Sequence, residues 1–516
     1  MKHLLLTTIA AVLVVGTAFA DPVPLAEIVL TRGPYLQMGT PTSVTIRWRS
    51  NRPVVGRVSY GFVPRQLTDS ILETEVTSEH QVTLVNLKPN TRYYYLVGAQ
   101  EKVLAGNDSD HYFNTPPVTG TLQPVRIWVL GDTGTGSNEA KAVRDAYFRK
   151  TGERDTSLIL HLGDLAYPDG SDADLQAKFF PVYQTLLRQT FFWPSLGNGD
   201  TGLLANPPED LPYFHVFSLP TQGEAGGIPS KTNRYYSFDY ANIHFISLDT
   251  MTSDRSPDGA MARWLVQDMK AAQQGWIIAY AHHAPYSKGS HDSDRSYETE
   301  MVEFRESILP ILEAGGVDLV LAGHSHNYER SMLMDGHYGS SNSLTKAMIL
   351  DGGDGKCKGD GYYLKPSRGQ APHEGAVYIV AGTGGSARSG TLDHPSMIVS
   401  HKRLGSLILE ITGNRLKAEF LGVKAPDDQV VLDHFTLIKG QLRLEPPKVL
   451  SNGDLVFDLL GVPGDNYLIE TSTDLSNWIS VKEIDIEFGR VPYQVNISLE
   501  DRERFYRARL NWSSNN

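Results

Sequence analysis

Six short apolar runs in the middle of the sequence, each passing into Gly, Asp or His, constrain the fold more than any other feature. Two stretches between them, residues 138–150 and 259–274, carry apolar residues at helical spacing. Buried strands that alternate with helices predict an α/β core with parallel strands. Such a core presents its site at the carboxyl ends of the strands, where these polar residues lie. The runs are RIWVL (126–130), SLILHL (157–162), HFISLD (244–249), WIIAYAH (276–282), VDLVLAG (317–323) and AVYIVAG (376–382).

Two segments with the alternation of β-strands flank this core. In residues 28–118, the stretch from Leu87 to Tyr93 has the L-x-P-x-T-x-Y spacing of a tyrosine corner. Together with Trp48 on an earlier predicted strand, it resembles a fibronectin type III sandwich. Short strands separated by turns return after the core, which we place at residues 122–439. Residues 442–516 are therefore expected to form a second small β-sandwich.

The first 20 residues have the pattern of a secretory signal. Lys2 precedes an apolar run that ends in Ala18-Phe19-Ala20, a small-residue cleavage site, so cleavage is expected before Asp21. The alternative is a membrane anchor, but the run is short and no later stretch is long enough to span a bilayer. We therefore expect a secreted or periplasmic protein that is not inserted in the membrane after cleavage.

Charge and cysteine content exclude several classes of protein. The formal net charge is −12, with no Lys/Arg tract, which argues against binding to nucleic acid or anionic membranes. Cys357 is the only cysteine, so no intrachain disulfide can form. It lies in the Gly- and Asp-rich segment 351–361, which we interpret as a surface loop because the spaced acidic ligands and closing Glu of a calcium loop are missing.

Residue types that bind metals follow successive apolar runs. A single Gly-Asp pair after a strand is more often an ordinary turn. The whole series, in one order and each at a strand end, is much harder to explain as turn chemistry. The candidates are Asp132 in GDTG, Asp164 and Tyr167 in GDLAY, Asn198 in GNGD, His283 in HHAPY, and His324 and His326 in GHSHNYER.

Together these blocks resemble the five-block signature of calcineurin-like metallophosphoesterases, and Tyr167 points to the purple acid phosphatases within that group. The resemblance covers the core, and the β module before it matches the domain that precedes the core in that family. The segment after residue 439 lies outside the resemblance. The implied architecture is a four-layer α/β/β/α core between a fibronectin type III-like sandwich and a small C-terminal β domain.

The resemblance also implies a cofactor of two metal ions bridged by Asp164. Carboxylates and a phenolate suit Fe³⁺, whereas imidazoles and an amide oxygen suit Zn²⁺, Mn²⁺ or Fe²⁺. The implied reaction is attack of metal-activated hydroxide on the phosphorus of a phosphate ester. The ligands that would complete the two sites are Asp132, Tyr167 and His326 for one ion, and Asn198, His283 and His324 for the other.

The HHAPY block offers two adjacent histidines. Either can be the ligand, and the H-x-P spacing favours His283, which leaves His282 a structural or supporting role. His161 and His244 lie inside apolar runs, so we interpret them as core histidines that orient their neighbours. Asp249, at the end of its run, is expected to support the ligands from outside.

One position departs from the family pattern. The family has Gly-Asn-His-Asp/Glu where this chain has Gly199 in place of His, and that imidazole is implied to bind phosphate and protonate the leaving group. Asn198 is retained, so metal binding is expected to survive. A proton donor is worth about 10²–10⁴ in rate. His291, in YSKGSH, matches another substrate-facing His of the family and is the expected donor, with Asp200 as a further candidate.

The predicted function is that of an exported acid phosphatase that hydrolyses phosphomonoesters. A phosphodiesterase or a nucleotide-pyrophosphate hydrolase fits the same motifs. From another class, a catalytically weakened metal-binding or surface-binding protein fits the loss of the His at Gly199 and the two flanking β modules. The C-terminal module is the candidate for contact with a surface or polymer.

Overall fold

The structure is a computed structural model that describes residues 27–511 apart from short gaps. The signal segment predicted at residues 1–20 and the single cysteine, Cys357, lie outside the described residues. Within the described part, no helix is both long and apolar enough to cross a membrane. The gaps are 101, 153–154, 203–207, 357–358, 426–427, 441–442, 462–464, 488 and 496–503.

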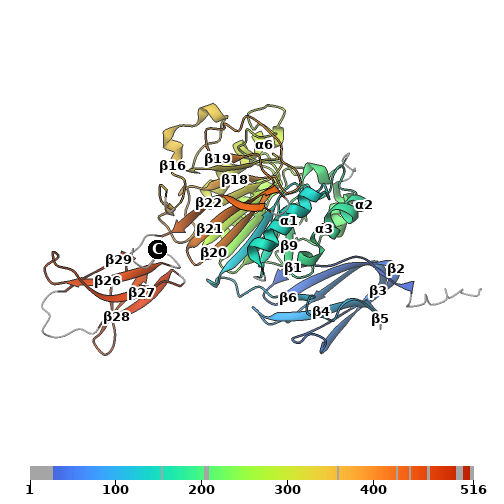
Figure 1. Cartoon of the computed structure of the whole chain (residues 1–516), viewed down its shortest axis with the longest axis horizontal. Helices are drawn as coiled ribbons and strands as arrows, with labels where there is room; N and C mark the ends of the chain where they lie inside the picture. Colours follow the sequence, from blue (N-terminus) through green and yellow to red (C-terminus); the bar gives the residue numbers. More distant parts are fainter. Residues whose placement is uncertain are drawn as a thin grey trace, which may run out of the picture.

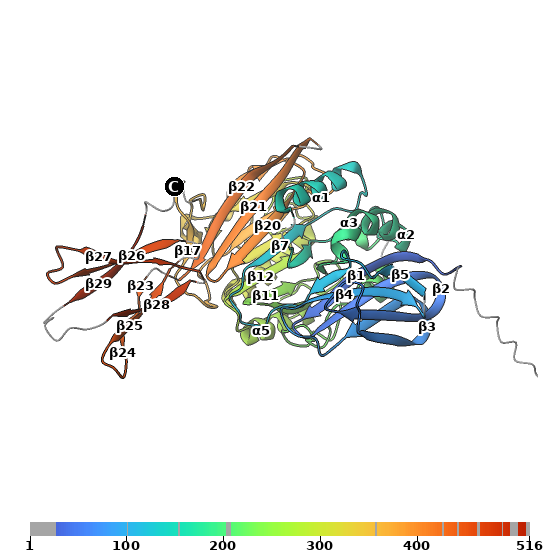
Figure 2. The ribbon, with the colours of Figure 1, turned by 60° about the horizontal axis from the view of Figure 1, so that its bottom comes forward.

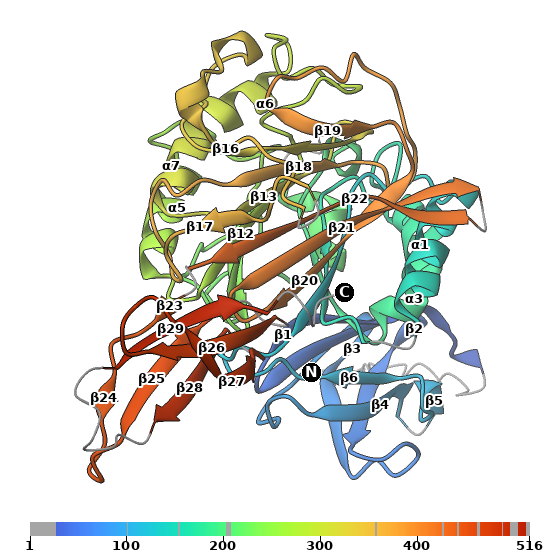
Figure 3. The ribbon, with the colours of Figure 1, turned by 60° about the vertical axis from the view of Figure 1, so that its left-hand side comes forward.

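Two sheets lie against each other in the core, and helices cover their outer faces. Figure 3 shows α1 and α3 on one flank and α5 and α7 on the other, with the strands of both sheets between them. This is the predicted four-layer α/β/β/α arrangement, and the predicted helices at 138–150 and 259–274 are confirmed as α1 and α5. The helices are α1 (Asn138–Thr151), α2 (Asp172–Asp174), α3 (Phe180–Leu187), α4 (Pro212–Val216), α5 (Ala260–Ala271), α6 (Thr299–Glu303) and α7 (Leu309–Ala314).

The first core sheet contains β7, β8 and β9, which are parallel, so their carboxyl ends lie at one edge. On the other side of β7, antiparallel strands extend the sheet in the order β20, β21, β22. The strands are β7 (Val125–Leu130), β8 (Leu158–His161), β9 (Phe191–Pro194), β17 (Tyr363–Lys365), β20 (Gly405–Thr412), β21 (Arg415–Ala425) and β22 (Asp428–Lys439).

The second core sheet has the order β10-β11-β12-β13-β18-β14-β19, and β11, β12, β13 and β18 are parallel. These strands are fully buried because helices cover one face and the first sheet covers the other, which explains their continuous apolar runs. The strands are β10 (Tyr236–Tyr240), β11 (Ile243–Ser247), β12 (Trp276–Ala281), β13 (Leu319–Ala322), β14 (Tyr328–Ser331), β18 (Val377–Ala381) and β19 (Met397–His401); β15 (Leu333–Met334) pairs with β16 (Ile349–Asp351) beside them.

Helix α1 illustrates how local sequence sets an element's ends. The side chain of Ser137 accepts a hydrogen bond from the Ala140 N–H and caps the first turn. Glu139 in the first turn and Lys150 in the last complement the helix dipole. The helix stops at Gly152, whose φ of 61° is a left-handed conformation that glycine adopts readily.

The N-terminal strands continue the first core sheet, because β1 pairs with β9 at Leu36 and Phe191 (Figure 1). The tyrosine corner is present: the Lys88 N–H donates to Tyr93 Oη at 2.9 Å. Trp48 is fully buried, as expected for a core residue of this module. The strands are β1 (Leu30–Thr40), β2 (Ser43–Gly61), β3 (Asp69–Leu84), β4 (Arg92–Ala99), β5 (Lys102–Gly106) and β6 (Tyr112–Asn114).

The C-terminal strands form two small sheets that extend away from the core (Figure 2). They enclose a small hydrophobic cluster of their own around Leu459, Tyr467 and Ile469. The first sheet contains β23 (Arg443–Leu444), β24 (Lys448–Val449), β25 (Leu455–Leu460) and β28 (Arg490–Val495), and the second contains β26 (Asn466–Ser472), β27 (Ile479–Asp485) and β29 (Phe505–Leu510).

Candidate metal centre

The loops that follow the parallel strands of the two core sheets meet at one place. The Asp132 N–H, after β7, donates to the Gly163 carbonyl after β8 at 3.0 Å. The His324 N–H, after β13, donates to Asp132 Oδ2 at 3.0 Å and so joins the two sheets. The candidate ligands in these loops are buried, whereas Asn198 is exposed and Tyr167 is partly exposed, so the cluster opens to solvent on their side.

Three of the predicted ligands have left-handed backbone conformations. The φ angles are 56° at Asp132, 59° at Asp164 and 65° at His324. A non-glycine residue in this region costs about 1–2 kcal/mol. Strained residues of this kind cluster at functional sites, where the surrounding structure holds them. Three of them in one cluster therefore mark these loops as a site.

Glycines precede the ligands because the loops approach one another closely. At Gly163, φ is +90° and a Cβ atom would lie 2.6 Å from His282 Nδ1. A Cβ atom at Gly323 would lie 2.5 Å from Asp132 Oδ2. Neither position has room for a side chain, which explains the Gly-Asp and Gly-His pairs of the sequence.

One group of predicted ligands gathers around the Tyr167 hydroxyl. It donates to Asp164 Oδ2 at 2.8 Å and lies 3.1 Å from His326 Nε2 and 3.4 Å from Asp132 Oδ1. Burial and the adjacent carboxylates raise the pKa of Tyr167 far above its ordinary value. A phenolate at this position therefore requires compensating cations.

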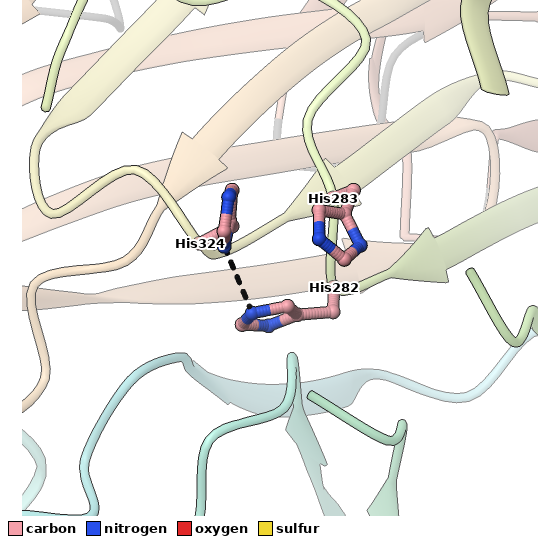
Figure 4. Close-up of side chains that lie close together, drawn as sticks. All are labelled: His282, His283 and His324. Carbon is pink, nitrogen blue, oxygen red and sulfur yellow. Dashed lines mark hydrogen bonds between the residues drawn. The ribbon is translucent and has the colours of Figure 1, made fainter. Parts of the chain in front are cut away.

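A second group gathers around the Asn198 side-chain oxygen. His282 Nε2 lies 2.8 Å from Asn198 Oδ1, and His324 Nδ1 lies 2.9 Å from the same atom. His282, His283 and His324 also place one ring nitrogen each within 4.8 Å of one another, and Figure 4 shows their rings converging. This arrangement brings an amide oxygen and three imidazoles together.

His282 lies nearer the predicted bridging carboxylate than the sequence suggested. Its Nδ1 donates to the Leu162 carbonyl at 2.8 Å, so Nε2 is the nitrogen available to a cation. That Nε2 faces Asn198 and lies 3.4 Å from Asp164 Oδ1. His283 Nδ1 instead contacts Thr250 Oγ1 at 2.8 Å. The geometry thus places His282 facing the cluster directly, so it remains an alternative to His283 as the ligand.

The second group has the chemistry expected of a cation site. Burial and the nearby His282 and His291 rings lower the pKa of His324 to about 4, and burial lowers that of His283 well below its ordinary value. His324 Nε2 faces the Glu298 carboxylate, so a ring that donates there presents Nδ1 as its ligand nitrogen. Although burial opposes its charge, the Asp164 and Asp132 carboxylates raise the pKa of His282, so a cation bound beside Asn198 Oδ1 and His324 Nδ1 would displace a proton from His282 Nε2.

The comparisons with known proteins agree with this geometry. The family model for calcineurin-like phosphoesterases matches residues 125–328, and the model for the purple acid phosphatase N-terminal domain matches residues 32–115. Purple acid phosphatase 23 of Arabidopsis thaliana is 26% identical over 351 residues, which span 57% of this chain and 73% of that protein. Probable purple acid phosphatase 20 of the same plant is 27% identical over 316 residues, spanning 57% and 68%.

This chain is a purple acid phosphatase-like member of the calcineurin-like metallophosphoesterases. The fold agrees: the solved structure of a purple acid phosphatase from yellow lupin (Lupinus luteus) seeds has a TM-score of 0.60 at 18% identity, covering 79% of this chain and 75% of that one. Purple acid phosphatases use binuclear metal centres. Some relatives of similar identity, such as probable inactive purple acid phosphatase 9 of Arabidopsis thaliana (24%), carry a name that denotes inactivity.

The position at which this purple acid phosphatase-like chain lacks a histidine lies inside the site. The Gly199 N–H donates to Asp164 Oδ1 at 2.6 Å. A Cβ atom at Gly199 would lie 2.8 Å from the Tyr167 ring. His291 is in the cluster as well: its ring lies 3.8 Å from that of His324, and its side chain is 32% exposed. Of the two predicted proton donors, His291 is therefore the accessible one.

The second predicted donor, Asp200, binds the backbone of the loops around it. Its side chain accepts hydrogen bonds from the backbone N–H groups of Asp164 at 2.8 Å, Leu165 at 2.7 Å and Gly197 at 3.0 Å. Only 1% of the residue is exposed. Because both carboxylate oxygens bind loop amides and none faces solvent, Asp200 holds the Asp164 loop in shape, and its role as a proton donor stays a prediction.

Several supporting residues carry no signal in the sequence. Ser386 Oγ lies 2.7 Å from His326 Nδ1, and Thr250 Oγ1 holds His283. Glu298 contacts both His291 and His324. They come from loops remote in sequence from the ligands, so only the tertiary structure reveals them. Such partners fix the tautomer and orientation of a ligand imidazole.

The predicted core histidines lie away from the cluster's open side. His161 is fully buried and its Nε2 bonds Thr133 Oγ1 at 2.8 Å. His244 lies between Asp239 and Asp268, at 2.7 and 2.9 Å. Asp249 accepts hydrogen bonds from the amides of residues 251 and 252, and so shapes the turn that carries Thr250. All three act on neighbouring protein groups, as their positions in the sequence suggested.

Proposed function

We propose that this chain is an exported binuclear metallophosphatase that hydrolyses phosphomonoesters. The observation that carries the proposal is the position of Asp164 between the two groups of ligands. Its Oδ2 accepts from Tyr167 at 2.8 Å, and its Oδ1 lies 3.4 Å from His282 Nε2. One carboxylate facing both groups is the arrangement that a bridging ligand requires.

The donor set fits one hard trivalent ion and one divalent ion. Two carboxylates and a phenolate favour Fe³⁺, whereas imidazoles and an amide oxygen favour Zn²⁺, Mn²⁺ or Fe²⁺. When bound, two such ions would neutralise the charge of a phosphoryl group and activate water near neutral pH. We assign Asp164 as the shared ligand, with Asp132, Tyr167 and His326 on one side and Asn198, His282 and His324 on the other; His283 is the alternative to His282.

The chain's own residues then bind and orient the ester. His291 is the accessible imidazole beside His324, and we assign it the transfer of a proton to the leaving group. Gly199 supplies only its backbone N–H, to Asp164. A site with one proton donor favours esters whose leaving group departs easily as an anion.

The proposal also covers export, the C-terminal module and the substrate class. The signal pattern of residues 1–20 supports a secreted or periplasmic protein. The C-terminal β module, which extends away from the core, is the proposed contact with a surface or polymer (Figure 2). The substrate class rests on the family resemblance and is what the following experiment tests.

Metal content and a panel of phosphate esters test the proposal together. We expect the purified protein to bind two metal ions per chain and to hydrolyse nitrophenyl phosphate, with loss of activity in a chelator and recovery on adding metal. Faster hydrolysis of bis-nitrophenyl phosphate or of a nucleotide pyrophosphate would replace the monoesterase assignment. Fewer than two ions per chain at saturation would refute the binuclear centre.

Matched substitutions distinguish the roles of the two adjacent histidines in metal binding. His282→Ala should remove the second ion, whereas His283→Ala should reduce its affinity less, since His283 does not contact Asn198 or Asp164. His434→Ala, at an exposed position on β22, is the control and should change neither metal content nor turnover. Loss of the ion only in His283→Ala would reverse the assignment.

One observation favours a second candidate, a catalytically weakened metal-binding protein. Gly199 removes an imidazole from the site, and relatives with names that denote inactivity exist at comparable identity. This candidate predicts two bound ions and no chelator-sensitive hydrolysis of any ester in the panel. Measurable hydrolysis of an aryl phosphate that depends on metal would exclude it.

A further inference from the structure

Glu298 connects two histidines of the candidate metal centre whose contact is not predictable from their spacing in the sequence. Its Oε1 lies 2.8 Å from His291 Nδ1, and its Oε2 lies 3.4 Å from His324 Nε2. The carboxylate is 12% exposed, and the two rings it contacts lie 3.8 Å apart. One side chain thus spans a proposed ligand and the proposed proton donor.

The chain directs Glu298 to this place. It is the residue before α6, yet its side chain does not cap the helix and turns to the histidines instead. The preceding loop is held by Lys288, whose ammonium group bonds Asp292 and Asp294 at 2.8 Å each. Asp294 also accepts the Ser341 N–H at 2.8 Å. The carboxylate is therefore presented from an anchored loop.

Glu298 sets which nitrogen of each ring carries a proton when an ion is bound. A carboxylate only accepts hydrogen bonds, so His291 presents Nδ1–H to Glu298, and His324 presents Nε2–H once its Nδ1 is a ligand. His324 Nδ1 is then left with its lone pair directed at Asn198 Oδ1, 2.9 Å away. His291 is held with its Nε2 directed away from the carboxylate.

We propose that Glu298 is a positioning residue that holds His324 in its metal-binding tautomer and His291 in its substrate-facing orientation. This rests on the proposed function, because it assumes an ion beside Asn198 and His324. Carboxylates that orient a ligand imidazole typically contribute about 10–100-fold to metal affinity or activity. Glu298 therefore couples the affinity for the second ion to the placement of the proton donor.

Titration with Zn²⁺ or Mn²⁺ against a competing chelator tests the proposal directly. In Glu298→Ala we expect the affinity for the second ion to fall by about 10–100-fold, with the first ion retained. Glu298→Gln should give an intermediate loss, since one amide oxygen replaces two acceptors. Glu300→Gln, two residues further on in α6, is the matched control. Its carboxylate lies 4.0 Å from Arg255, away from the histidines, and the metal affinities of this variant should equal those of the wild type.

Thermal unfolding of the metal-free proteins separates positioning from folding. We expect equal thermal unfolding midpoints for the wild type and the variants. If Glu298→Ala does not unfold cooperatively, the affinity of the isosteric Glu298→Gln for the second ion decides instead. A folded variant that binds the second ion as tightly as the wild type overturns the positioning role of Glu298 but leaves the proposed function intact. A wild-type protein that does not bind two ions refutes the proposed function instead.

The link to His291 has a readout of its own. The experiment measures kcat for an alkyl phosphate at saturating metal in Glu298→Ala, in His291→Ala and in the double variant. If Glu298 acts on turnover through His291, the fold-loss in the double variant should be smaller than the product of the two single fold-losses. A double loss equal to that product would mean that Glu298 does not position His291.

Discussion

Placing a side chain at Gly199 tests both the packing and the chemistry of the site. A Cβ atom there would lie 2.8 Å from two carbons of the Tyr167 ring and 3.1 Å from Asp164 Cγ. The Gly199 φ is outside the left-handed region, so the obstacle to a larger residue is contact with the ring rather than backbone strain. Gly199→Ala adds that contact alone, whereas Gly199→His adds the same contact and an imidazole.

The size of the packing effect follows from the distance. Ordinary contacts of a Cβ atom lie at 3.4–4 Å, so the Tyr167 ring must move by several tenths of an ångström. The ring is held through its hydroxyl by Asp164 at 2.8 Å and His326 at 3.1 Å. Overpacking costs about 1–3 kcal/mol. Because the displaced ring must return to its position to bind the ion, this cost opposes metal binding. Tenfold corresponds to about 1.4 kcal/mol, so we expect both variants to bind the ion beside Tyr167 about 5–150-fold more weakly.

Turnover at saturating metal isolates the contribution of the imidazole. Nitrophenolate leaves without protonation, whereas an alkoxide needs a proton donor. We therefore expect Gly199→His to exceed Gly199→Ala by up to about a hundredfold on an alkyl phosphate and to match it on nitrophenyl phosphate. The metal affinities of Gly199→Ala and Gly199→His, measured in the same preparations, show whether the contact with the Tyr167 ring weakens metal binding equally in both.

Two results would refute this reasoning. Equal alkyl phosphate turnover in the two variants would mean that an imidazole at position 199 is not a proton donor in this site. Wild-type metal affinity in Gly199→Ala would mean that the Tyr167 ring yields freely, contrary to the contacts that hold it.

Further predictions concern single residues. Tyr167→Phe should bleach a purple charge-transfer band in the iron-loaded protein; a colourless, iron-saturated and active wild type would contradict phenolate ligation. Asp164→Asn should remove activity and most bound metal, and retention of two ions with normal turnover would exclude a bridging role. His291→Ala should reduce turnover of alkyl phosphates far more than that of nitrophenyl phosphate; equal losses would indicate phosphate binding instead. Although burial opposes its charge, hydrogen bonds to Asp239 and Asp268 raise the pKa of His244 to about 9. About 3 kcal/mol of stability, present below pH 6.5, should therefore be lost between pH 6.5 and 9, and denaturant unfolding of His244→Gln should not show this loss.

The sequence by itself determined the strands, the principal helices and the places where the candidate ligands lie. Apolar runs such as residues 276–282 predict buried strands because hydrophobic period and length are local properties. Parallel strands then bring their carboxyl ends to one edge, so Asp132, Asp164 and His324 were predicted as one cluster from their positions after such runs. The glycines before these residues are equally predictable from the sequence, since only glycine fits where the loops approach so closely.

The tertiary structure alone decided what each polar side chain does. His282 and His283 are adjacent in sequence, and the hydrogen bond from His282 to the Leu162 carbonyl, on another strand's loop, turns the His282 ring toward Asn198. Glu298 reaches the site only through the anchored loop before α6. Side-chain roles of this kind depend on contacts between segments far apart in the chain, and spacing within one segment carries no information about them.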